Sequence, residues 1–233
     1  MLRKTLILFM IVLSFGPRAA AQDDDDAWYR LELGGGLGLG SMLDDTNDKA
    51  FGNNGFAASL IARFPLNPRM AIKTQLGFLN SKNDVSKVTN FYPAQPGIAG
   101  PEALKYNYSG SLLDLAVMYE LHFLPYGYLP SYLGYSRIVP FIQMGLGTSY
   151  STVSKAACVS IPLGVGIKYK LARRWNLGLD WRINFTTSDK LEGLEAPHGI
   201  TTSGFKKKDH YNILQLSVTY DLSPKCPTCN RYR

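Results

Sequence analysis

Residues 158–171 read CVSIPLGVGIKYKL, and apolar side chains alternate with polar or small ones along this stretch. One face carries Val159, Ile161, Leu163, Val165, Ile167, Tyr169 and Leu171, and the other carries Cys158, Ser160, Gly164, Gly166, Lys168 and Lys170. A period of two is typical of an extended strand with two unlike sides. The stretch therefore predicts a strand with one apolar face, but a soluble sheet also needs such strands.

The same alternation recurs along the whole chain. Each alternating segment is about ten or more residues long, which is the length that a tilted strand needs to cross a bilayer. Strands of ordinary globular proteins are nearer five or six residues. The predicted strands are 28–40, 55–65, 69–80, 109–123, 137–150, 157–171, 174–187 and 211–222. We therefore predict an all-β fold, an eight-stranded antiparallel up-and-down transmembrane β-barrel over residues 28–222.

The N-terminus has the order of a secretory signal peptide. Arg3 and Lys4 precede an apolar stretch over 6–15, and three alanines follow at 19–21. This stretch is too short to span roughly 30 Å of hydrocarbon as a helix. We predict a cleaved signal peptide over 1–21, an acidic leader over 22–27 and a tail over 223–233. Both ends of the mature chain are then expected in the periplasm, with the barrel in the bacterial outer membrane.

The unbroken apolar faces favour a membrane barrel over a soluble one. A soluble barrel such as a lipocalin keeps its apolar face inside, whereas a membrane barrel turns this face to lipid and fills its lumen with polar side chains. A charge at mid-depth on the lipid face would cost roughly 2–4 kcal/mol, and no charge interrupts the stripes.

The predicted lumen face carries charges of both signs. Buried charges persist only when they are paired and hydrogen-bonded. We therefore expect an ion-pair core and no conducting pore, since an eight-stranded barrel is narrow enough for side chains to fill. The residues of this predicted core are Glu32, Arg63, Lys73, Asp114, Glu120, Lys168, Asp180 and Arg182.

One connection on the expected periplasmic side is unusually long. Residues 124–136 read LPYGYLPSYLGYS and contain Tyr126, Tyr128, Tyr132 and Tyr135. Two interpretations stay open. The tyrosines could rest on lipid headgroups, or they could form a docking surface for a periplasmic protein, because Tyr supplies contact area at low entropic cost.

The three cysteines separate into two groups. Cys158 lies at the outer end of a predicted strand, whereas Cys226 and Cys229 lie in the tail KCPTC (225–229). Some 30 Å separates these levels, and a disulfide needs Cα atoms within about 7 Å, so Cys158 cannot join the tail. In an oxidising periplasm we expect a disulfide within the tail or to another chain.

Other function classes find little support in the sequence. The formal net charge of +7 falls to about +4 when Arg3, Lys4 and Arg18 leave with the signal peptide, which does not indicate nucleic acid binding. We predict no catalytic residues, no cofactor and no metal site. An enzyme of the barrel type is a weak alternative, because no Ser–His–acid spacing stands out.

Three stretches and the tail carry a resemblance to a known family. They are WYRLELGGGLGLGSMLDDTND (28–48), VPFIQMGLGTSYS (139–151) and IPLGVGIKYKLARRWNLGLDWRINFTTSDKLEG (161–193). With the KCPTC tail, they resemble the PorG-like family, outer-membrane barrels of the Bacteroidetes type IX secretion system. The resemblance implies a non-catalytic component that anchors a periplasmic lipoprotein ring.

The resemblance also implies partners. Besides outer-membrane lipids, we expect ring subunits to bind Cys226, Cys229 and the tyrosine-rich connection, with an intermolecular disulfide as one form of the link. The alternative is a stand-alone, adhesin-like surface barrel whose outer loops bind lipid or host molecules.

Overall fold

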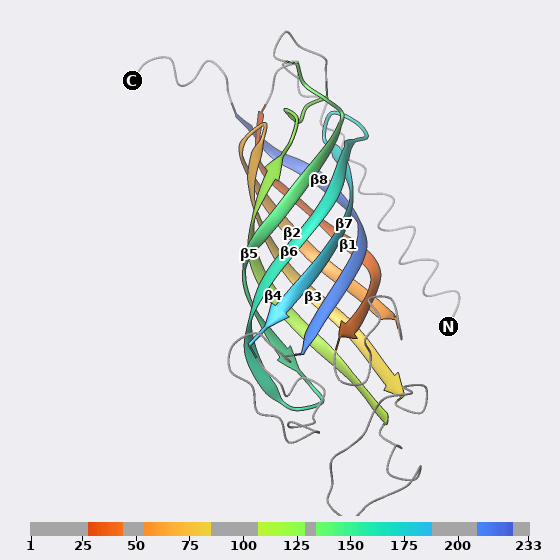
Figure 1. The fold of residues 1–233 in the computed structure, drawn as a ribbon. Helices are drawn as coiled ribbons and strands as arrows, with labels where there is room; N and C mark the ends of the chain where they lie inside the picture. Colours follow the sequence, from red (N-terminus) through yellow and green to blue (C-terminus); the bar gives the residue numbers. More distant parts are fainter. Residues whose placement is uncertain (1–27, 44–53, 85–106, 129–133, 188–208, 226–233) are drawn as a thin grey trace, which may run out of the picture. The chain divides into compact units, whose positions relative to one another are not determined.

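The computed structural model describes residues 28–43, 54–84, 107–128, 134–187 and 209–225. In these ranges the chain forms a closed barrel of eight antiparallel strands, which confirms the predicted fold (Figure 1). The strands are β1 (Trp28–Leu43), β2 (Gly55–Asn67), β3 (Met70–Asp84), β4 (Asn107–His122), β5 (Ile138–Ser151), β6 (Ala156–Lys170), β7 (Trp175–Thr186) and β8 (His210–Lys225). The predicted signal peptide, acidic leader and cysteine tail lie outside the described residues.

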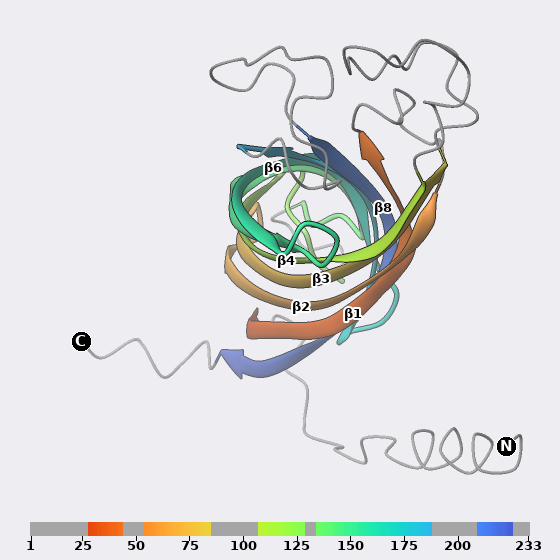
Figure 2. The same cartoon turned by 90° about the horizontal axis from the view of Figure 1, so that it is seen from below.

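Each strand pairs with its neighbours in the sequence, and β1 also pairs with β8 (Figure 2). The closing ladder runs from Trp28 opposite Lys225 to Leu43 opposite His210. Every strand therefore has a partner on both sides. Closure removes the unpaired backbone groups of a sheet edge, which could not be tolerated in hydrocarbon.

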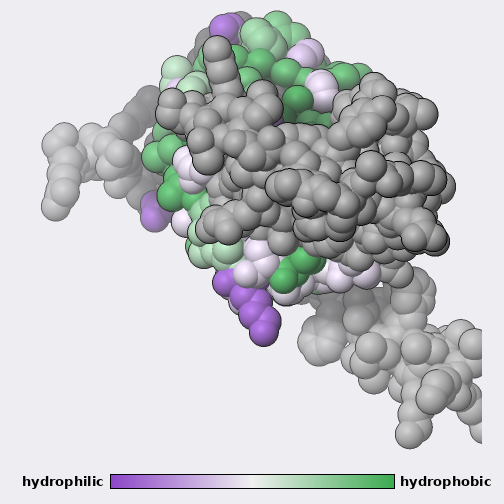
Figure 3. All heavy atoms as spheres, turned by 60° about the horizontal axis from the view of Figure 1, so that its bottom comes forward, coloured by the Kyte–Doolittle hydropathy of each residue, from purple (hydrophilic) through white to green (hydrophobic). Residues whose placement is uncertain are grey.

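The two faces of the wall differ as the alternation predicts. In β6, Ile167 is 49% exposed while its neighbour Lys168 is 2% exposed, and in β4 the same contrast separates Val117 from Met118. Large exposed apolar side chains lie on all eight strands, and much of the wall visible beside the grey atoms in Figure 3 is green. This is the inverse of a soluble barrel.

No helix in the described part of the chain has the length and apolar character needed to cross a membrane.

Pro162 cannot donate to the ladder because it has no amide hydrogen, and such a proline often marks a bulge, but the register around it shows none. On the β5 side the register is the same before and after it, with Met144 opposite Leu163 and Gly147 opposite Ser160. On the β7 side Pro162 itself lies opposite Asn184 without a shift. The proline thus interrupts the ladder locally but leaves the alternation of faces intact.

The connections divide between two ends of the barrel. The turn end carries the connections 68–69, 123–137 and 171–174, together with the start of β1 and the end of β8. The loop end carries the connections 44–54, 85–106, 152–155 and 187–209. Apart from 152–155, the loop-end connections are longer than the two tight turns at the turn end, as the sequence predicts.

Candidate functional site

The lumen brings together all eight residues of the predicted ion-pair core. Each of them is at most 2% exposed, and each forms an ion pair within the set. Six strands supply them, because even-numbered positions of β1, β4, β6 and β7 and odd-numbered positions of β2 and β3 point inward. The residues are Glu32, Arg63, Lys73, Asp114, Glu120, Lys168, Asp180 and Arg182.

Arg63 is the centre of this network. Its Nε and Nη2 donate to the two carboxylate oxygens of Glu120 at 2.6 and 3.1 Å, and its Nη1 donates to Glu32. Lys168 Nζ donates to the other oxygen of Glu32 at 2.6 Å. A bidentate guanidinium–carboxylate pair fixes geometry as well as charge, so Arg63 links β2 rigidly to β1 and β4.

Lys73 extends the network toward β7. Its Nζ lies 3.5 Å from Asp180 Oδ2 and 3.7 Å from Glu120 Oε1, and it donates to Gln143 Oε1 at 3.2 Å. Gln215 Nε2 donates to Asp180 at 3.1 Å, and Ser59 Oγ donates to Gln215 Oε1 at 2.9 Å. The side-chain amides of Gln143 and Gln215 therefore bond to Lys73 and Asp180 beside their charged partners.

Arg182 and Asp114 form a separate pair nearer the loop end, with Nη2 donating to Oδ2 at 3.0 Å. Asp114 has room because Gly77 lies opposite it in β3. A Cβ at Gly77 would stand 2.0 Å from Asp114 Oδ1, which is closer than real side chains approach. A side chain at position 77 would therefore force the Asp114 carboxylate to move.

A cluster of buried apolar side chains lies in the lumen at the loop end. Tyr211, fully buried, shares a 2.7 Å hydrogen bond with Ser149 Oγ. Cys158 is a free, buried cysteine in this region. The buried apolar cluster consists of Met42, Ala57, Leu79, Leu112, Cys158, Tyr211 and Ile213.

Tyr126 lies against the lumen at the turn end. Its hydroxyl donates to Asn176 Oδ1 at 2.7 Å, and its ring centre lies 4.4 Å from Lys168 Nζ and 5.4 Å from Lys170 Nζ. Its amide donates to the Pro68 carbonyl at 2.9 Å. Burial, followed by the nearby carboxylates of Glu32 and Asp221, raises the pKa of the Tyr126 phenol, so the phenol stays protonated and can donate.

A second set of polar residues, which the predicted core did not include, lies next to Tyr126. Lys170 pairs with Asp221 and also donates to Asn176 Oδ1 at 2.9 Å. Asn176 Nδ2 in turn donates to Asp221 Oδ1 at 2.9 Å. The alternation does put these residues on the polar face of their strands, but it gives no sign that Tyr126 would join them.

With these additions the network contains five carboxylates and five cationic side chains, so its formal charge is zero. The carboxylates are Glu32, Asp114, Glu120, Asp180 and Asp221, and the cations are Arg63, Lys73, Lys168, Lys170 and Arg182. Among the described residues, no group of His, Cys, Asp and Glu could hold a metal ion. The network therefore fills the lumen with ion pairs whose formal charges cancel.

Closed antiparallel strands with apolar outer walls and a polar lumen are the architecture of an outer-membrane barrel. The sequence family described as "Outer membrane protein beta-barrel domain" matches residues 6–221. The chain belongs to this family. As an outer-membrane barrel it is placed in the outer membrane of a bacterium.

Solved outer-membrane barrels share the architecture at low sequence identity. Neisserial surface protein A is 13% identical, covering 82% of this chain and 97% of its own, with a TM-score of 0.46. Ail of Yersinia pestis is 10% identical, covering 84% and 100%, with a TM-score of 0.45. A major outer membrane protein of Thermus thermophilus is 16% identical, covering 82% and 99%, with a TM-score of 0.44. These likenesses concern the fold alone, and no curated protein matches the chain.

The four tyrosines of the turn-end connection do not form one group in this outer-membrane barrel. Tyr126 is half-buried, and its hydroxyl and ring face Asn176 and Lys168 of the lumen. Tyr128 is half-buried, with the Arg137 guanidinium 4.1 Å from its ring centre and Arg137 Nε donating to its carbonyl at 3.1 Å. Tyr135 is half-buried beside Gly127, and Tyr132 lies outside the described residues, as do Cys226 and Cys229.

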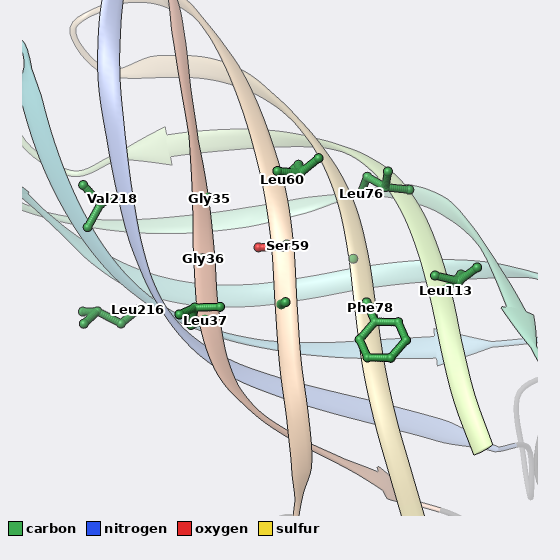
Figure 4. A pocket seen from close by; sticks show the side chains of 12 residues that line it. Gly35, Gly36, Leu37, Ser59, Leu60, Leu76, Phe78, Leu113, Leu216 and Val218 are labelled. Carbon is green, nitrogen blue, oxygen red and sulfur yellow. The ribbon is translucent and has the colours of Figure 1, made fainter. Parts of the chain in front are cut away.

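A shallow apolar groove of about 770 Å³ crosses the outer wall over β1, β2 and β3 (Figure 4). The groove is hollow where the small residues Gly35 and Ala58 lie, and Leu37, Leu60 and Phe78 are among the side chains around it. All of these residues lie on the lipid-facing wall. The groove could not be predicted from the sequence, because it depends on which small residues of neighbouring strands lie next to one another.

Proposed function

We propose that this outer-membrane barrel is a non-catalytic anchor for a periplasmic partner, as a component of a protein secretion machine of the type IX kind. In this proposal the turn end faces the periplasm, the partner is a lipoprotein ring, and Cys226 or Cys229 contributes a covalent link. The resemblance of 28–48, 139–151 and 161–193 to PorG-like barrels supports the choice of machine.

Two observations together support the proposal: side chains fill the lumen, and the connection 123–137 at the turn end is bonded to the barrel. The central charges of the lumen are held by bonds to one another, as Arg63 with Glu32 and Glu120 illustrates, which suits an anchor better than a pore. The connection 123–137 is fastened to the barrel through Tyr126 and presents Tyr128 and Arg137 beside each other. Tyr and Arg are the residue types enriched at the energetic centres of protein interfaces.

Site-specific photocrosslinking in living cells tests the proposal. A photoreactive residue in place of Tyr128 is expected to give a light-dependent adduct with a periplasmic protein, whereas one in place of Lys155 at the loop end is not. Tyr128→Ala with Arg137→Ala should reduce the secretion of exported proteins while leaving the barrel folded. Adducts at position 155 alone would favour the stand-alone surface barrel instead.

The covalent part of the proposal is tested separately. Non-reducing electrophoresis of membranes should show a high-mass band that disappears in Cys226→Ser or Cys229→Ser and persists in Cys158→Ser. A banding pattern that is unchanged in both tail variants would remove the disulfide link from the proposal without affecting the non-covalent contact at Tyr128.

A further inference from the structure

The charges of the barrel are distributed unequally between its interior and its surface. All six carboxylates whose side chains the structure describes are buried, whereas several cationic side chains are exposed. The carboxylates are Glu32, Asp114, Glu120, Asp180, Asp209 and Asp221. Among the residues whose side chains the structure describes, the exposed charges are therefore cationic.

Most of this surface charge lies at the turn end. Five arginines there are exposed or half-exposed, and we name them the arginine collar: Arg30, Arg69, Arg137, Arg173 and Arg174. They belong to β1, the β2–β3 turn, the residue before β5 and the β6–β7 turn. Because the strands follow one another around the ring, the collar is spread over the circumference instead of forming a patch on one side.

The depth of the collar follows from its neighbours in the sequence. Arg137 precedes Ile138, which is 56% exposed, and Arg173 follows shortly after Leu171, which is 57% exposed on the lipid-facing wall. Consecutive Cα atoms are about 3.8 Å apart, so these guanidinium groups lie within a few residues of the apolar band. The headgroup layer on each side of the hydrocarbon is roughly 5–7 Å thick, which puts the collar in this layer.

Aromatic side chains mark the same level. Trp175, directly after the β6–β7 turn, packs edge-to-face against Tyr220 of β8 with ring centres 5.1 Å apart. Trp175 is 43% exposed on the outer wall. Trp and Tyr collect at the boundary between hydrocarbon and headgroups, so this pair independently places the turn end at that boundary.

We propose that the arginine collar binds the phosphate groups of anionic glycerophospholipids in the leaflet that surrounds the turn end. Guanidinium groups match phosphate oxygens with paired hydrogen bonds, and they carry their charge at any physiological pH. Basic residues at a membrane surface attract anionic lipids over distances of a Debye length. The site is a lipid annulus, and of its five arginines only Arg137 is shared with the contact proposed for the secretion partner.

The arrangement favours lipid over an acidic protein as the occupant. The turns 68–69 and 171–174 are tight, so the backbone of Arg69 and Arg173 stays close to the ends of the strands. A lipid annulus surrounds the barrel on all sides, as the collar does. A protein partner would instead be matched by charges gathered on one side.

Native mass spectrometry of the full chain tests the proposal. The protein is folded in detergent and offered equal amounts of phosphatidylglycerol and phosphatidylcholine, and bound lipids are counted. We expect a preference for phosphatidylglycerol that falls roughly 25-fold in the Arg30→Gln, Arg69→Gln double variant, at roughly fivefold per arginine. The matched control Lys155→Gln, which removes an exposed cation at the loop end, should retain the preference.

Heat-dependent mobility in electrophoresis reports whether each variant is folded, and the single variant Arg69→Gln serves if the double variant is not. Equal binding of the two lipids by the unaltered protein would overturn the proposal, and so would an unchanged preference in the folded variants. Stronger binding of lipid A than of phosphatidylglycerol would overturn the assignment to a phospholipid leaflet. Loss of a periplasmic crosslink in Arg30→Gln, Arg69→Gln without any lipid preference would assign the collar to a protein partner instead.

Discussion

The two halves of the lumen differ in what fills them, although the same eight strands line both. The turn half contains the network around Arg63 and Lys73 and ends at Tyr126. The loop half contains the apolar cluster that includes Leu79 and Tyr211. The turn half thus contains most of the charge pairs across the lumen, whereas the loop half combines an apolar cluster with uncharged polar side chains such as Asn184 and Asn212.

The difference shows how side chains alone can fill the lumen of a narrow barrel, without a plug domain. Charges fill space only if each one finds a partner, so the turn half needs side chains of matched sign from several strands at the same level. Apolar side chains need only complementary shapes, so the loop half tolerates changes that preserve volume. Substitutions should therefore have distinct effects in the two halves.

The largest effect is expected from Arg63→Ala in the turn half. The change leaves Glu32 and Glu120 buried without their main partner, and breaking a buried pair in this way costs about 3–5 kcal/mol. Urea unfolding in lipid bilayers, followed by tryptophan fluorescence, measures the free energy of unfolding. Arg63→Lys is the control, because it keeps one charge and should lose less. A loss below about 1 kcal/mol for Arg63→Ala would show that the network does not hold this half together.

A somewhat smaller effect is expected from Leu79→Ala in the loop half. Leu79 is fully buried in the apolar cluster, and truncation should lower the free energy of unfolding by about 3 kcal/mol through lost contacts and a cavity. Leu76→Ala in the same strand is the matched control. Leu76 is 50% exposed on the lipid-facing wall, where lipid chains replace the lost contacts, so its loss should be well under that of Leu79. Equal losses at the two positions would contradict the assignment of inner and outer faces in β3.

The smallest effect is expected from Tyr126→Phe at the mouth of the turn half. The variant keeps the ring over Lys168 but removes the hydrogen bond to Asn176, so it should lose about 0.5–1.5 kcal/mol in the same urea titration. Tyr128→Phe should lose less, because Arg137 contacts the ring and the main-chain carbonyl of Tyr128. If Tyr128→Phe were the more damaging change, Tyr126 would not be the residue that seals the mouth.

The inward-facing charged residues of the turn half could be predicted from the sequence, because the side chains of a strand alternate between its two faces. Alternation assigned Lys168 and Asp180 to the inner face, and the cost of unpaired buried charge then required them to find partners. The individual partners could not be predicted, since Lys168 pairs with Glu32, far away in the chain. Such pairs depend on the stagger of the strands and on the span of side chains across the lumen.

The connection at the turn end shows more clearly what could not be predicted from the sequence. The tyrosine-rich connection was recognisable as unusual, but its sequence favoured a surface role equally for Tyr126 and Tyr128. The fold separates them, because the amide of Tyr126 bonds to the Pro68 carbonyl and its ring turns toward Lys168. Irregular backbone has no period from which the direction of a side chain can be read.

The sequence by itself determined the class of fold, the number of strands and the face on which each strand residue lies. It did so because the side-chain period of a strand is two and because hydrocarbon excludes charge. Only the tertiary structure decided which charges pair, that Tyr126 enters the lumen and that five arginines surround one end. These features arise between residues that are distant in the chain, and closure of the barrel is what sets their separation in space.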